Sequence, residues 1–354
     1  MFEFDESVDQ VAKIKVVGVG GGGSNAVNTM IAAQIDGVEF MVANTDAQAL
    51  RANLSSMRVQ IGPKLTKGLG AGANPEVGRE AAEEDRARSA ELLKGADMVF
   101  IAAGLGGGTG TGAAPVIAEV AKELGALTVA VVTKPFAFEG KQRMGKAVQG
   151  VEELKQIVDS LILIPNDRLT GLAGKQMGIL DAFKPADDVL RQAVQGISDL
   201  ITTHGMINVD FADVQSAMSE RGMAMMGIGT ATGENRACEA AQQAISSPLL
   251  EEIDISGAKG VLVNVTGSSS MTMADYEEVA NIIHEKVHED ANIFIGLVVN
   301  EDMGETIQVT AIATGFGCSF DTGKRPSTEL GRPNVQTPTK IDRDIPAFIR
   351  REQQ

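Results

Sequence analysis

Two glycine-rich loops are the first places in this sequence where chemistry could occur. The first contains Gly18 and Gly20–Gly23, ends in Ser24 and Asn25, and lies between a short apolar run and a helical pattern. Glycines let the backbone approach a phosphate closely, and the amides at a helix N-terminus favour negative charge. On its own this loop is compatible with a nucleotide site, a dinucleotide-binding fold or a tight strand-to-helix turn.

The second loop makes a triphosphate site the better interpretation. Residues 104–112 hold six glycines together with Thr109 and Thr111, and a helix is expected to follow from Ala113-Ala-Pro115. A dinucleotide-binding fold needs one glycine-rich loop at the start of a helix to bind its pyrophosphate. Two such loops at one edge of the sheet can instead hold a triphosphate from two sides. The pattern GxxxxGK[ST] does not occur in the sequence, which excludes an ordinary P-loop.

Short β-branched runs alternate with longer helical patterns in the first half of the chain, which predicts a parallel α/β sheet. The expected strands are Lys13–Gly18, Val38–Asn44, Met98–Ala103, Leu127–Thr133 and Ser160–Pro165. The expected helices are Asn25–Ala33, Pro75–Leu93, Ala113–Leu124 and Lys141–Val158. Because ligands of such sheets bind at the carboxyl ends of the strands, both glycine loops are placed where a ligand is expected.

One long helix is predicted from Pro185 to His204, because apolar residues recur there at spacings of three and four. At 1.5 Å per residue this helix is a rod of about 30 Å. Asp187 lies at its start, whereas Asp210 and Asp213 follow its end. Carboxylates so far from the first site cannot reach the same nucleotide, so they are either surface charges or act on the nucleotide of a neighbouring molecule.

A second block and a tail follow the long helix. The block has expected strands at Gly260–Val265, Ile293–Val299 and Ile307–Ala313, and expected helices at Asn235–Ile245 and Thr272–His288. Residues 318–341 lack apolar periodicity, which predicts a disordered linker. Residues 342–354 regain helical spacing, with Asp344, Ile345, Pro346, Phe348 and Ile349 as the candidate binding residues. Acids that precede Pro346 and arginines that follow Ile349 suit the helix dipole and predict a segment that folds into a partner's groove.

Composition excludes several classes of protein. The 354 residues contain 31 Lys and Arg against 47 Asp and Glu, a formal net charge of −16, which argues against a nucleic-acid partner. Cys238 and Cys318 form no CxxC pair, which suggests a reducing compartment. The acidic N-terminus has no signal-peptide core and no apolar run approaches the ~18 residues that span a bilayer. We therefore expect a cytoplasmic protein without direct membrane insertion.

Two further motifs have a competing structural interpretation. His284, Glu285 and His288 fit the HExxH pattern of zinc proteases, with both histidines on one helical face. Because the sequence has one other histidine, His204, and no clear third-ligand motif, we expect an amphipathic helix there instead, with its apolar side inward. The methionine-rich run Arg221–Gly227 could form a metal or partner surface, but we expect its methionines to fill gaps in the core.

The two glycine-rich loops and several later motifs together resemble those of the tubulin/FtsZ GTPase family. The loop at 104–112 is similar to the signature loop of that family, and Gly20–Asn25 is similar to the version found in its bacterial FtsZ branch. Further matches follow in order at Asn44–Asp46, Gly70–Pro75, Pro135–Arg143, Asn166, Phe183 and Asn208–Asp213. The resemblance covers about residues 12–317 and the last ten or so residues.

The resemblance implies a role for each matched residue. The glycine loops would bind phosphates, residues 71–73 would sense the γ-phosphate, and Glu139 and Arg143 would hold the ribose and nearby groups. Asn25, Asn166 and Asp187 would bind guanine and Phe183 would pack on its face, with Asp188 as the alternative carboxylate one position later. The implied nucleotide-binding set is Gly20, Gly21, Gly22, Ser24, Asn25, Asn44, Asp46, Ala71, Gly72, Ala73, Gly104, Gly106, Gly107, Gly108, Thr109, Gly110, Thr111, Pro135, Glu139, Arg143, Asn166, Phe183 and Asp187.

The resemblance also implies an organisation and an activity. The organisation is a disordered N-terminus (1–11), a Rossmann-like GTP-binding domain (12–180), a central helix (181–205), a smaller α/β polymerisation domain (206–317), the disordered linker (318–341) and a partner-binding peptide (342–354). The activity is polymerisation-dependent hydrolysis of GTP to GDP with Mg²⁺ on the phosphates. Asn208, Asp210 and Asp213 would complete the site of the next subunit in a head-to-tail filament.

In this family the filaments form the bacterial division ring, and the tail peptide would bind an FtsA-type membrane anchor and other division regulators at the inner face of the membrane. Two alternatives remain open from the residues. One is an NAD(P)-binding oxidoreductase built on Gly18–Gly23, with Asp46 on the ribose, and the other is a metalloprotease using His284 and His288. GTP-dependent light scattering that decays as GTP is consumed would favour the GTPase, whereas tight NAD(H) binding without assembly would favour the oxidoreductase.

Overall fold

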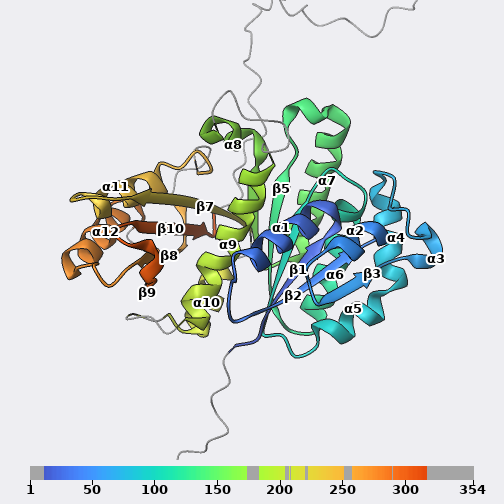
Figure 1. Cartoon of the computed structure of the whole chain (residues 1–354), viewed down its shortest axis with the longest axis horizontal. Helices are drawn as coiled ribbons and strands as arrows, with labels where there is room; N and C mark the ends of the chain where they lie inside the picture. The colour runs from blue at the N-terminus through green and yellow to red at the C-terminus, as the bar shows by residue number, and fades with distance from the viewer. Residues whose placement is uncertain are drawn as a thin grey trace, which may run out of the picture. The chain divides into compact units, whose positions relative to one another are not determined.

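Ten strands form one continuous sheet in the described part of the chain, in the order β3-β2-β1-β4-β5-β6-β7-β10-β8-β9 (Figure 1). The structure is a computed structural model, and it describes residues 12–173, 183–203, 207, 209–219, 222–250, 257–288 and 290–316. The predicted N-terminal segment 1–11, linker 318–341 and tail peptide 342–354 lie outside these residues, as do His204 and Asn208.

The strands divide into a parallel part and a mixed part. Their bounds are β1 (Ile14–Val19), β2 (Val38–Asn44), β3 (Met57–Gln60), β4 (Met98–Gly104), β5 (Leu127–Lys134), β6 (Ser160–Pro165), β7 (Gly222–Ala231), β8 (Gly260–Gly267), β9 (Asn292–Val299) and β10 (Ile307–Thr314). All pairings among β1–β6 are parallel, whereas β10 runs antiparallel to both β7 and β8. The expected parallel α/β sheet in the first half of the chain is confirmed.

The helices of the described residues cover both faces of this sheet. They are α1 (Gly20–Ala32), α2 (Ala47–Ala52), α3 (Pro63–Thr66), α4 (Pro75–Glu84), α5 (Arg86–Leu93), α6 (Thr109–Glu123), α7 (Lys141–Ile157), α8 (Asn166–Ala173), α9 (Lys184–Thr202), α10 (Phe211–Met218), α11 (Arg236–Ile245) and α12 (Met273–Lys286). Short 3₁₀ turns occur at Ala137–Glu139 and Glu301–Met303.

Alternating side chains on the central strands build a separate core on each face of the sheet. Val16 and Phe100 pack in the core that α1 and α9 cover, whereas their neighbours Val17 and Ile101 pack in the core that α4, α6 and α7 cover. All four side chains are fully buried. The near-continuous apolar runs of β1 and β4 are typical of parallel strands that are covered on both faces.

Strand β7 joins the two parts of the sheet. Its first residues pair in parallel with β6, from Ser160↔Gly222 to Ile162↔Ala224, and its later residues pair with β10. The strand includes most of the methionine-rich run, and Met223, Met225 and Met226 are buried. Their expected place in the core is confirmed, although we did not predict a strand there because the run is rich in glycine and poor in β-branched residues.

Helix α9 packs against strands of both parts of the sheet, and Figure 1 shows it between them. At Gly196 a Cβ would lie 3.1 Å from the Cγ2 of Thr310 on β10, so glycine allows this close approach. The Nδ2 of Asn264 on β8 donates a hydrogen bond to the Gly196 carbonyl at 3.1 Å. The predicted long helix is therefore tied to the second block through its middle.

Several predicted boundaries were wrong. Helices α1 and α6 begin at Gly20 and Thr109 rather than at Asn25 and Ala113, because packing at the strand ends overrides the poor helix propensity of glycine. The predicted helix Pro75–Leu93 is two helices, separated at Asp85, whose Oδ2 accepts a hydrogen bond from Gly62 N at 2.8 Å. Beyond β7, the structure adds the short elements β3, α2, α3, α8 and α10, which periodicity over a few residues does not reveal.

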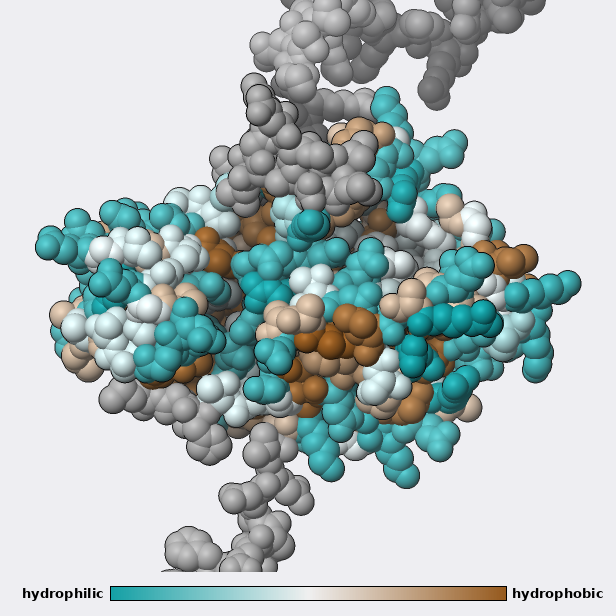
Figure 2. Space-filling view, viewed as in Figure 1, coloured by the Kyte–Doolittle hydropathy of each residue, from teal (hydrophilic) through white to brown (hydrophobic). Residues whose placement is uncertain are grey.

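Hydrophilic residues cover most of the face that Figure 2 shows, with smaller apolar areas between them. Among the described helices, none combines the length and apolar character that crossing a membrane requires.

Candidate nucleotide-binding site

Two helices begin at the carboxyl ends of the neighbouring strands β1 and β4, and neither receives a hydrogen bond from a side-chain cap. Neither helix has an acidic residue in its first turn, so the amides and the positive dipole ends are available to an anion. A Cβ on Gly20 would lie 2.7 Å from Gly110 N, and a Cβ on Gly22 would lie 3.1 Å from the Cα of Gly104. The two glycine loops therefore touch and form one cradle.

The glycines of this cradle are needed for different structural reasons. A Cβ at Gly21 or Gly107 would meet no heavy atom within 4 Å, so these two positions border open space. Gly106 has a φ of +97°, and a Cβ there would lie 2.7 Å from the carbonyl oxygen of Arg143. Gly21 and Gly107 thus leave room beside the uncapped amides, whereas Gly106 is required by the fold of the turn.

Two hydroxyl residues of the predicted set stabilise the loops themselves. The Oγ of Ser24 donates to the Gly20 carbonyl at 2.6 Å within the first turn of α1. The Oγ1 of Thr111 accepts a hydrogen bond from Gly106 N at 2.8 Å. Both side chains are buried, so they hold the cradle in shape.

The loop Gly70–Asn74 lies against the second glycine loop. Gly70, Gly72 and Ala73 all have positive φ, at +87°, +58° and +58°. A Cβ on Gly108 would lie 2.8 Å from the Cβ of Ala71. The Nζ of Lys146 on α7 donates to the Ala73 carbonyl at 2.6 Å, which holds the left-handed Ala73 in place. Sequence reasoning missed Lys146, although it lies one turn after Arg143.

The Asn44–Asp46 turn supports the cradle from β2. Asp46 caps α2, with its Oδ1 accepting from Gln48 N at 2.8 Å and from Ala49 N at 3.2 Å, and Asn44 Oδ1 accepts from Asp46 N. Between them Thr45 is fully buried, and its Oγ1 lies 2.7 Å from the Oγ1 of Thr109 at the start of α6. Thr45 was not among the predicted site residues. Its position between Asn44 and Asp46 in the matched motif was the one sequence feature that pointed to it. Contact of Asn44 and Asp46 with nucleotide stays a prediction.

A hollow of about 130 Å³ adjoins the cradle between α1, α9 and the ends of β4 to β6. Its lining brings together predicted residues that are up to 165 positions apart in the chain, namely Gly22, Asn25, Gly104, Pro135, Glu139, Arg143, Asn166, Phe183 and Asp187. Leu105, Thr133, Ala186 and Leu190 complete the wall, and none of these four was predicted.

The polar groups in this hollow fit a guanine base. Within the described ranges the Oδ1 of Asn166 is buried and has no hydrogen-bond partner. Burial raises the pKa of Asp187 to about 6 from its ordinary 3.8. A buried acceptor without a donor is costly. The N1–H and N2–H groups of guanine are donors of the kind that these two side chains lack, whereas adenine does not offer that pair.

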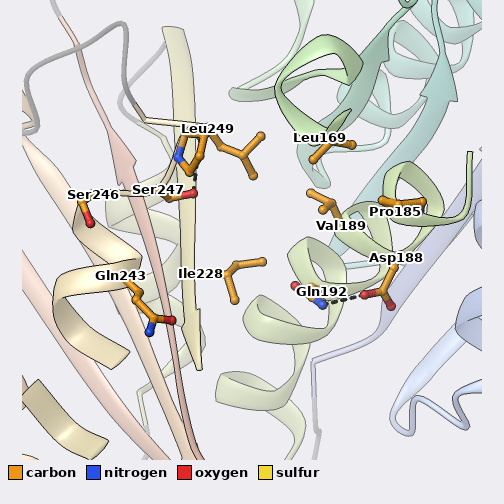
Figure 3. Close-up of a pocket in the computed structure, with 11 residues that line it drawn as sticks. Leu169, Pro185, Asp188, Val189, Gln192, Ile228, Gln243, Ser246, Ser247 and Leu249 are labelled. Carbon is orange, nitrogen blue, oxygen red and sulfur yellow. Dashed lines mark hydrogen bonds between the residues drawn. The ribbon is translucent and has the colours of Figure 1, made fainter. Parts of the chain in front are cut away.

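The structure also distinguishes Asp187 from Asp188. Asp188 lines a different cavity of about 480 Å³ between α9, β7 and residues 246–249, and Figure 3 shows Gln192 beside it. Its Oδ1 lies 2.7 Å from Arg191 Nε and its Oδ2 accepts from Gln192 Nε2 at 2.7 Å. Asp188 is therefore already paired and does not line the hollow, so Asp187 is the carboxylate available there.

Aromatic and charged side chains form the outer wall of the hollow. The rings of Phe136 and Phe183 meet edge-to-face at 5.3 Å, and Phe183 remains 42% exposed. Glu139 accepts a hydrogen bond from Phe136 N at 2.8 Å and pairs with Arg143 at 3.0 Å. Phe183 thus has a free surface for a base, and Glu139 holds Arg143 at the edge of the hollow.

The carboxylates of α10 lie away from this hollow. Asp210 is exposed, Asp213 is partly exposed, and neither lines the hollow. Figure 1 shows α10 at the lower end of α9, whereas α8, which begins at Asn166, lies near the upper end. The 19 residues of α9 span about 28 Å. The structure thus keeps Asp210 and Asp213 apart from the residues that could bind a nucleotide.

The predicted helical arrangement of His284 and His288 was wrong. Helix α12 ends at Lys286, and Val287 is already extended, with a φ of −102° and a ψ of 154°. Of the apolar residues expected to face inward, Val279, Ile283 and Val287 are buried and Ile282 is partly buried, while both histidines are exposed. No cluster of three or more potential metal-ligating side chains occurs within the described ranges. The helical HExxH geometry is therefore not formed.

Two touching, uncapped helix N-termini beside a guanine-compatible hollow define an α/β nucleotide-binding protein. A family model described as the GTPase domain of the Tubulin/FtsZ family matches residues 13–174, and the model of the C-terminal domain of the FtsZ family matches residues 222–317. The chain belongs to the tubulin/FtsZ family.

Curated relatives support this assignment over the length of the chain. The chain is 52% identical to the cell division protein FtsZ of Coxiella burnetii over 99% of both chains. It is 57% identical to that of Pseudomonas aeruginosa, over 91% of this chain and 82% of the relative.

Solved structures agree with the fold. An FtsZ structure from M. jannaschii, described as an empty dimer, is 47% identical and has a TM-score of 0.83 over 86% of this chain and 88% of that one. CetZ1 from Haloferax volcanii, a GDP-bound monomer, is 22% identical with a TM-score of 0.72, over 86% and 94% of the two chains, and shows the same fold.

Proposed function

We propose that this chain binds and hydrolyses GTP and assembles head-to-tail into filaments of the bacterial cell-division ring. The observation that carries this proposal is the hollow in which the unpartnered Asn166 Oδ1 and the partly buried Asp187 lie beside two uncapped helix N-termini. Family membership supports the same activity. The oxidoreductase alternative has no such support, and Asp46, its candidate ribose ligand, caps α2 with its carboxylate.

The nucleotide would lie along the cradle with its base in the hollow. Amides at the starts of α1 and α6 would bind the phosphates, and the loop Gly70–Asn74 would contact the γ-phosphate. Asn25, Asn166 and Asp187 would bind guanine, with Phe183 against its face. Mg²⁺ usually takes few protein ligands and several phosphate or water oxygens. It would here be held through the phosphates and would neutralise charge that develops on them during hydrolysis.

Hydrolysis would be completed by a second copy of the chain. Asp210 and Asp213, together with Asn208, would position or polarise the attacking water at the nucleotide of the adjacent subunit. A head-to-tail contact does not close on itself, so the same contact would propagate a filament. Turnover would then depend on assembly.

The tail peptide would connect the filament to the membrane. Asp344, Ile345, Pro346, Phe348 and Ile349 would dock in a groove of an FtsA-type anchor or another division regulator. Deletion of residues 342–354 should leave GTP-dependent assembly unchanged and abolish anchor binding. Binding of the truncated chain with undiminished affinity would contradict this role.

Light scattering with a nucleotide series tests the proposal as a whole. GTP with Mg²⁺ should give a signal that decays as GTP is consumed, whereas ATP and NAD(H) should give none. Chelation should abolish the decay, and added Mg²⁺ should restore it. Tight NAD(H) binding without assembly would overturn the proposal.

A further inference from the structure

Asp213 of helix α10 and Asp210, the residue that precedes the helix, are the carboxylates of the proposed split site, and the second block of the sheet holds the helix in place. Its buried side consists of Val214, Ala217 and Met218, whereas Asp210 is exposed and Asp213 is partly exposed. Val214 and Met218 pack in the core that also contains Leu262 of β8 and Ile312 of β10. The position of Asp213 is therefore set by how α10 docks on these strands.

The segment before α10 is attached to the edge strand β9. Leu297 N donates to the Ile207 carbonyl at 3.0 Å. Gly296 allows this approach, because a Cβ there would lie 2.2 Å from the Cδ2 of Leu200 and 3.2 Å from the Cγ2 of Val209. This attachment fixes where the chain enters α10.

A buried hydroxyl attaches the other end of α10. The Oγ1 of Thr314, the last residue of β10, donates to the Ala217 carbonyl at 2.6 Å and lies 3.2 Å from the Gly260 carbonyl. The Ala217 carbonyl belongs to the last four of the helix, which lack acceptor partners within an α-helix. Thr314 is 1% exposed, so water cannot readily replace its hydroxyl.

Gly260 makes this contact sterically feasible. Thr314 and Gly260 are directly paired residues of β10 and β8. A Cβ on Gly260 would lie 2.8 Å from Thr314 Oγ1 and 3.2 Å from the Ala217 carbonyl oxygen. Any side chain at this position would push α10 away from the sheet or displace the hydroxyl.

Asp213 lies about one helical turn before Ala217 on the same short helix, with Ala217 on its buried side and Asp213 partly exposed. A hydrogen bond that fixes the Ala217 carbonyl therefore fixes both the rotation of α10 about its axis and the direction in which Asp213 points. We infer that Thr314, with Gly260 opposite it, is a positioning residue for GTP hydrolysis. It orients Asp213 toward the nucleotide of the neighbouring subunit. This inference rests on the proposed function of Asp213.

The test compares GTP turnover per assembled subunit in Thr314→Val and Thr314→Ser. The valine variant keeps the shape of the side chain but removes the donor, and we expect about tenfold slower turnover because small errors in the position of a reacting group are costly. The affinity for GTP and the protein concentration needed for assembly should stay at the wild-type values. The serine variant should restore turnover to within about twofold of wild type.

Three further variants separate positioning from general destabilisation. Thr128→Val removes another buried hydroxyl-to-carbonyl hydrogen bond, at the start of β5, and should keep wild-type turnover. Gly260→Ala displaces α10 while Thr314 keeps its hydroxyl, so it should also slow turnover even if Thr314→Val fails to fold. Asp213→Ala reports on the proposed function itself.

The outcomes distinguish failure of the positioning role of Thr314 from failure of the proposed function of Asp213. Slow turnover in Thr314→Val and Gly260→Ala, with unchanged affinity and recovery in Thr314→Ser, supports the inference. Wild-type turnover in Thr314→Val or Gly260→Ala, with Asp213→Ala impaired, overturns the inference alone. Wild-type turnover in Asp213→Ala overturns the proposed function, and equal losses in Thr128→Val and Thr314→Val overturn the positioning role.

Discussion

The two ends of α9 carry carboxylates in opposite situations. At the N-terminal end Asp187 lies in the hollow with Asn166 and Phe183, and burial raises its pKa to about 6. Beyond the C-terminal end Asp210 is exposed and Asp213 partly exposed on α10, and neither lines that hollow. One end has the geometry of a nucleotide-binding site, and the other carries carboxylates that lie outside that site.

The difference indicates a division of roles between the two ends. A buried acceptor without a donor is a group prepared for recognition, because a bound donor removes its desolvation cost. Exposed carboxylates have no such cost and contribute nothing to binding until another surface covers them. We therefore expect substitutions at the Asp187 end to change affinity and substitutions at the α10 end to change turnover.

The largest effect is expected for Asp213→Ala. GTP affinity should stay at the wild-type value, and turnover should fall by about 10²-fold, because a group that positions or polarises the attacking water contributes that order of magnitude. Steady-state phosphate release and equilibrium GTP binding measure the two quantities. Glu91→Ala is the matched control, because it removes an exposed carboxylate from helix α5. This variant should behave as wild type.

Asp187→Asn should have the next largest effect and should act on affinity. The amide presents a donor toward guanine in place of an acceptor, which weakens GTP binding about 10- to 10²-fold. Asp188→Asn is the matched control one position later, since Asp188 pairs with Arg191 and lines the other cavity. Equal losses of affinity in the two variants would contradict the assignment of Asp187.

The affinity for GTP should also depend on pH through Asp187. In the proposed site guanine would bind the ionised carboxylate of Asp187, so the affinity for GTP should fall up to tenfold per pH unit as the pH drops below about 6. The unliganded fold should show the opposite trend. Since the folded pKa is raised, the stability present with protonated Asp187 is lost as the pH rises from about 4 to about 6.

Comparison with Asp187→Asn isolates this pH dependence from the titration of the nucleotide itself. The substitution should remove the part of the pH dependence that Asp187 causes. Asp199→Asn is the control, because burial also raises the pKa of Asp199 to about 6, yet Asp199 does not line the hollow. A pH profile of Asp187→Asn that matches wild type would argue against this account.

A smaller effect is expected at Lys146. Lys146→Met removes the donor that holds Ala73 at positive φ, so the loop Gly70–Asn74 should relax and the preference for GTP over GDP should fall roughly threefold to tenfold. Competition binding of the two nucleotides measures this ratio. Lys94→Met, at an exposed position after α5, should leave the ratio unchanged.

The smallest effect on function is expected for Thr272→Ala in the second block. Thr272 caps α12 by accepting a hydrogen bond from Asp275 N at 3.2 Å, and loss of such a cap costs about 1 kcal/mol of stability. The melting temperature should fall by about 2 °C while turnover stays unchanged. A large loss of turnover here would mean that stability of the second block alone controls hydrolysis.

Much of the fold could be predicted because its signals are long or repeated. Buried apolar strands alternating with helices indicate a parallel sheet, and the apolar spacing around Val189–Ile201 indicates α9. Strand β7 was missed because Gly222–Gly227 has neither β-branched residues nor alternation, and pairing with both β6 and β10 decides its conformation. The early starts of α1 and α6 depend on packing that glycine propensity does not reveal.

Residues of the candidate site could be predicted where a recognisable motif contains them. They were harder to predict where only the three-dimensional packing decides which side chain lines the hollow. The sequence left Asp187 and Asp188 as alternatives, and only the rotation of α9 shows that they line different cavities. Lys146 and Thr314 act through main-chain carbonyls that are 73 and 97 positions away in the chain. Such contacts leave no local spacing pattern in the sequence.

A mixing experiment tests the split site most directly. Asp213→Ala supplies an intact nucleotide site with a defective α10, and Asp187→Asn supplies an intact α10 with a weakened nucleotide site. At a GTP concentration that fills only the Asp213→Ala subunits, each variant alone should show little turnover. The account predicts that the mixture regains turnover as the fraction of Asp187→Asn subunits rises, because their α10 meets the GTP of Asp213→Ala neighbours. A mixture no more active than the sum of its parts would contradict the account.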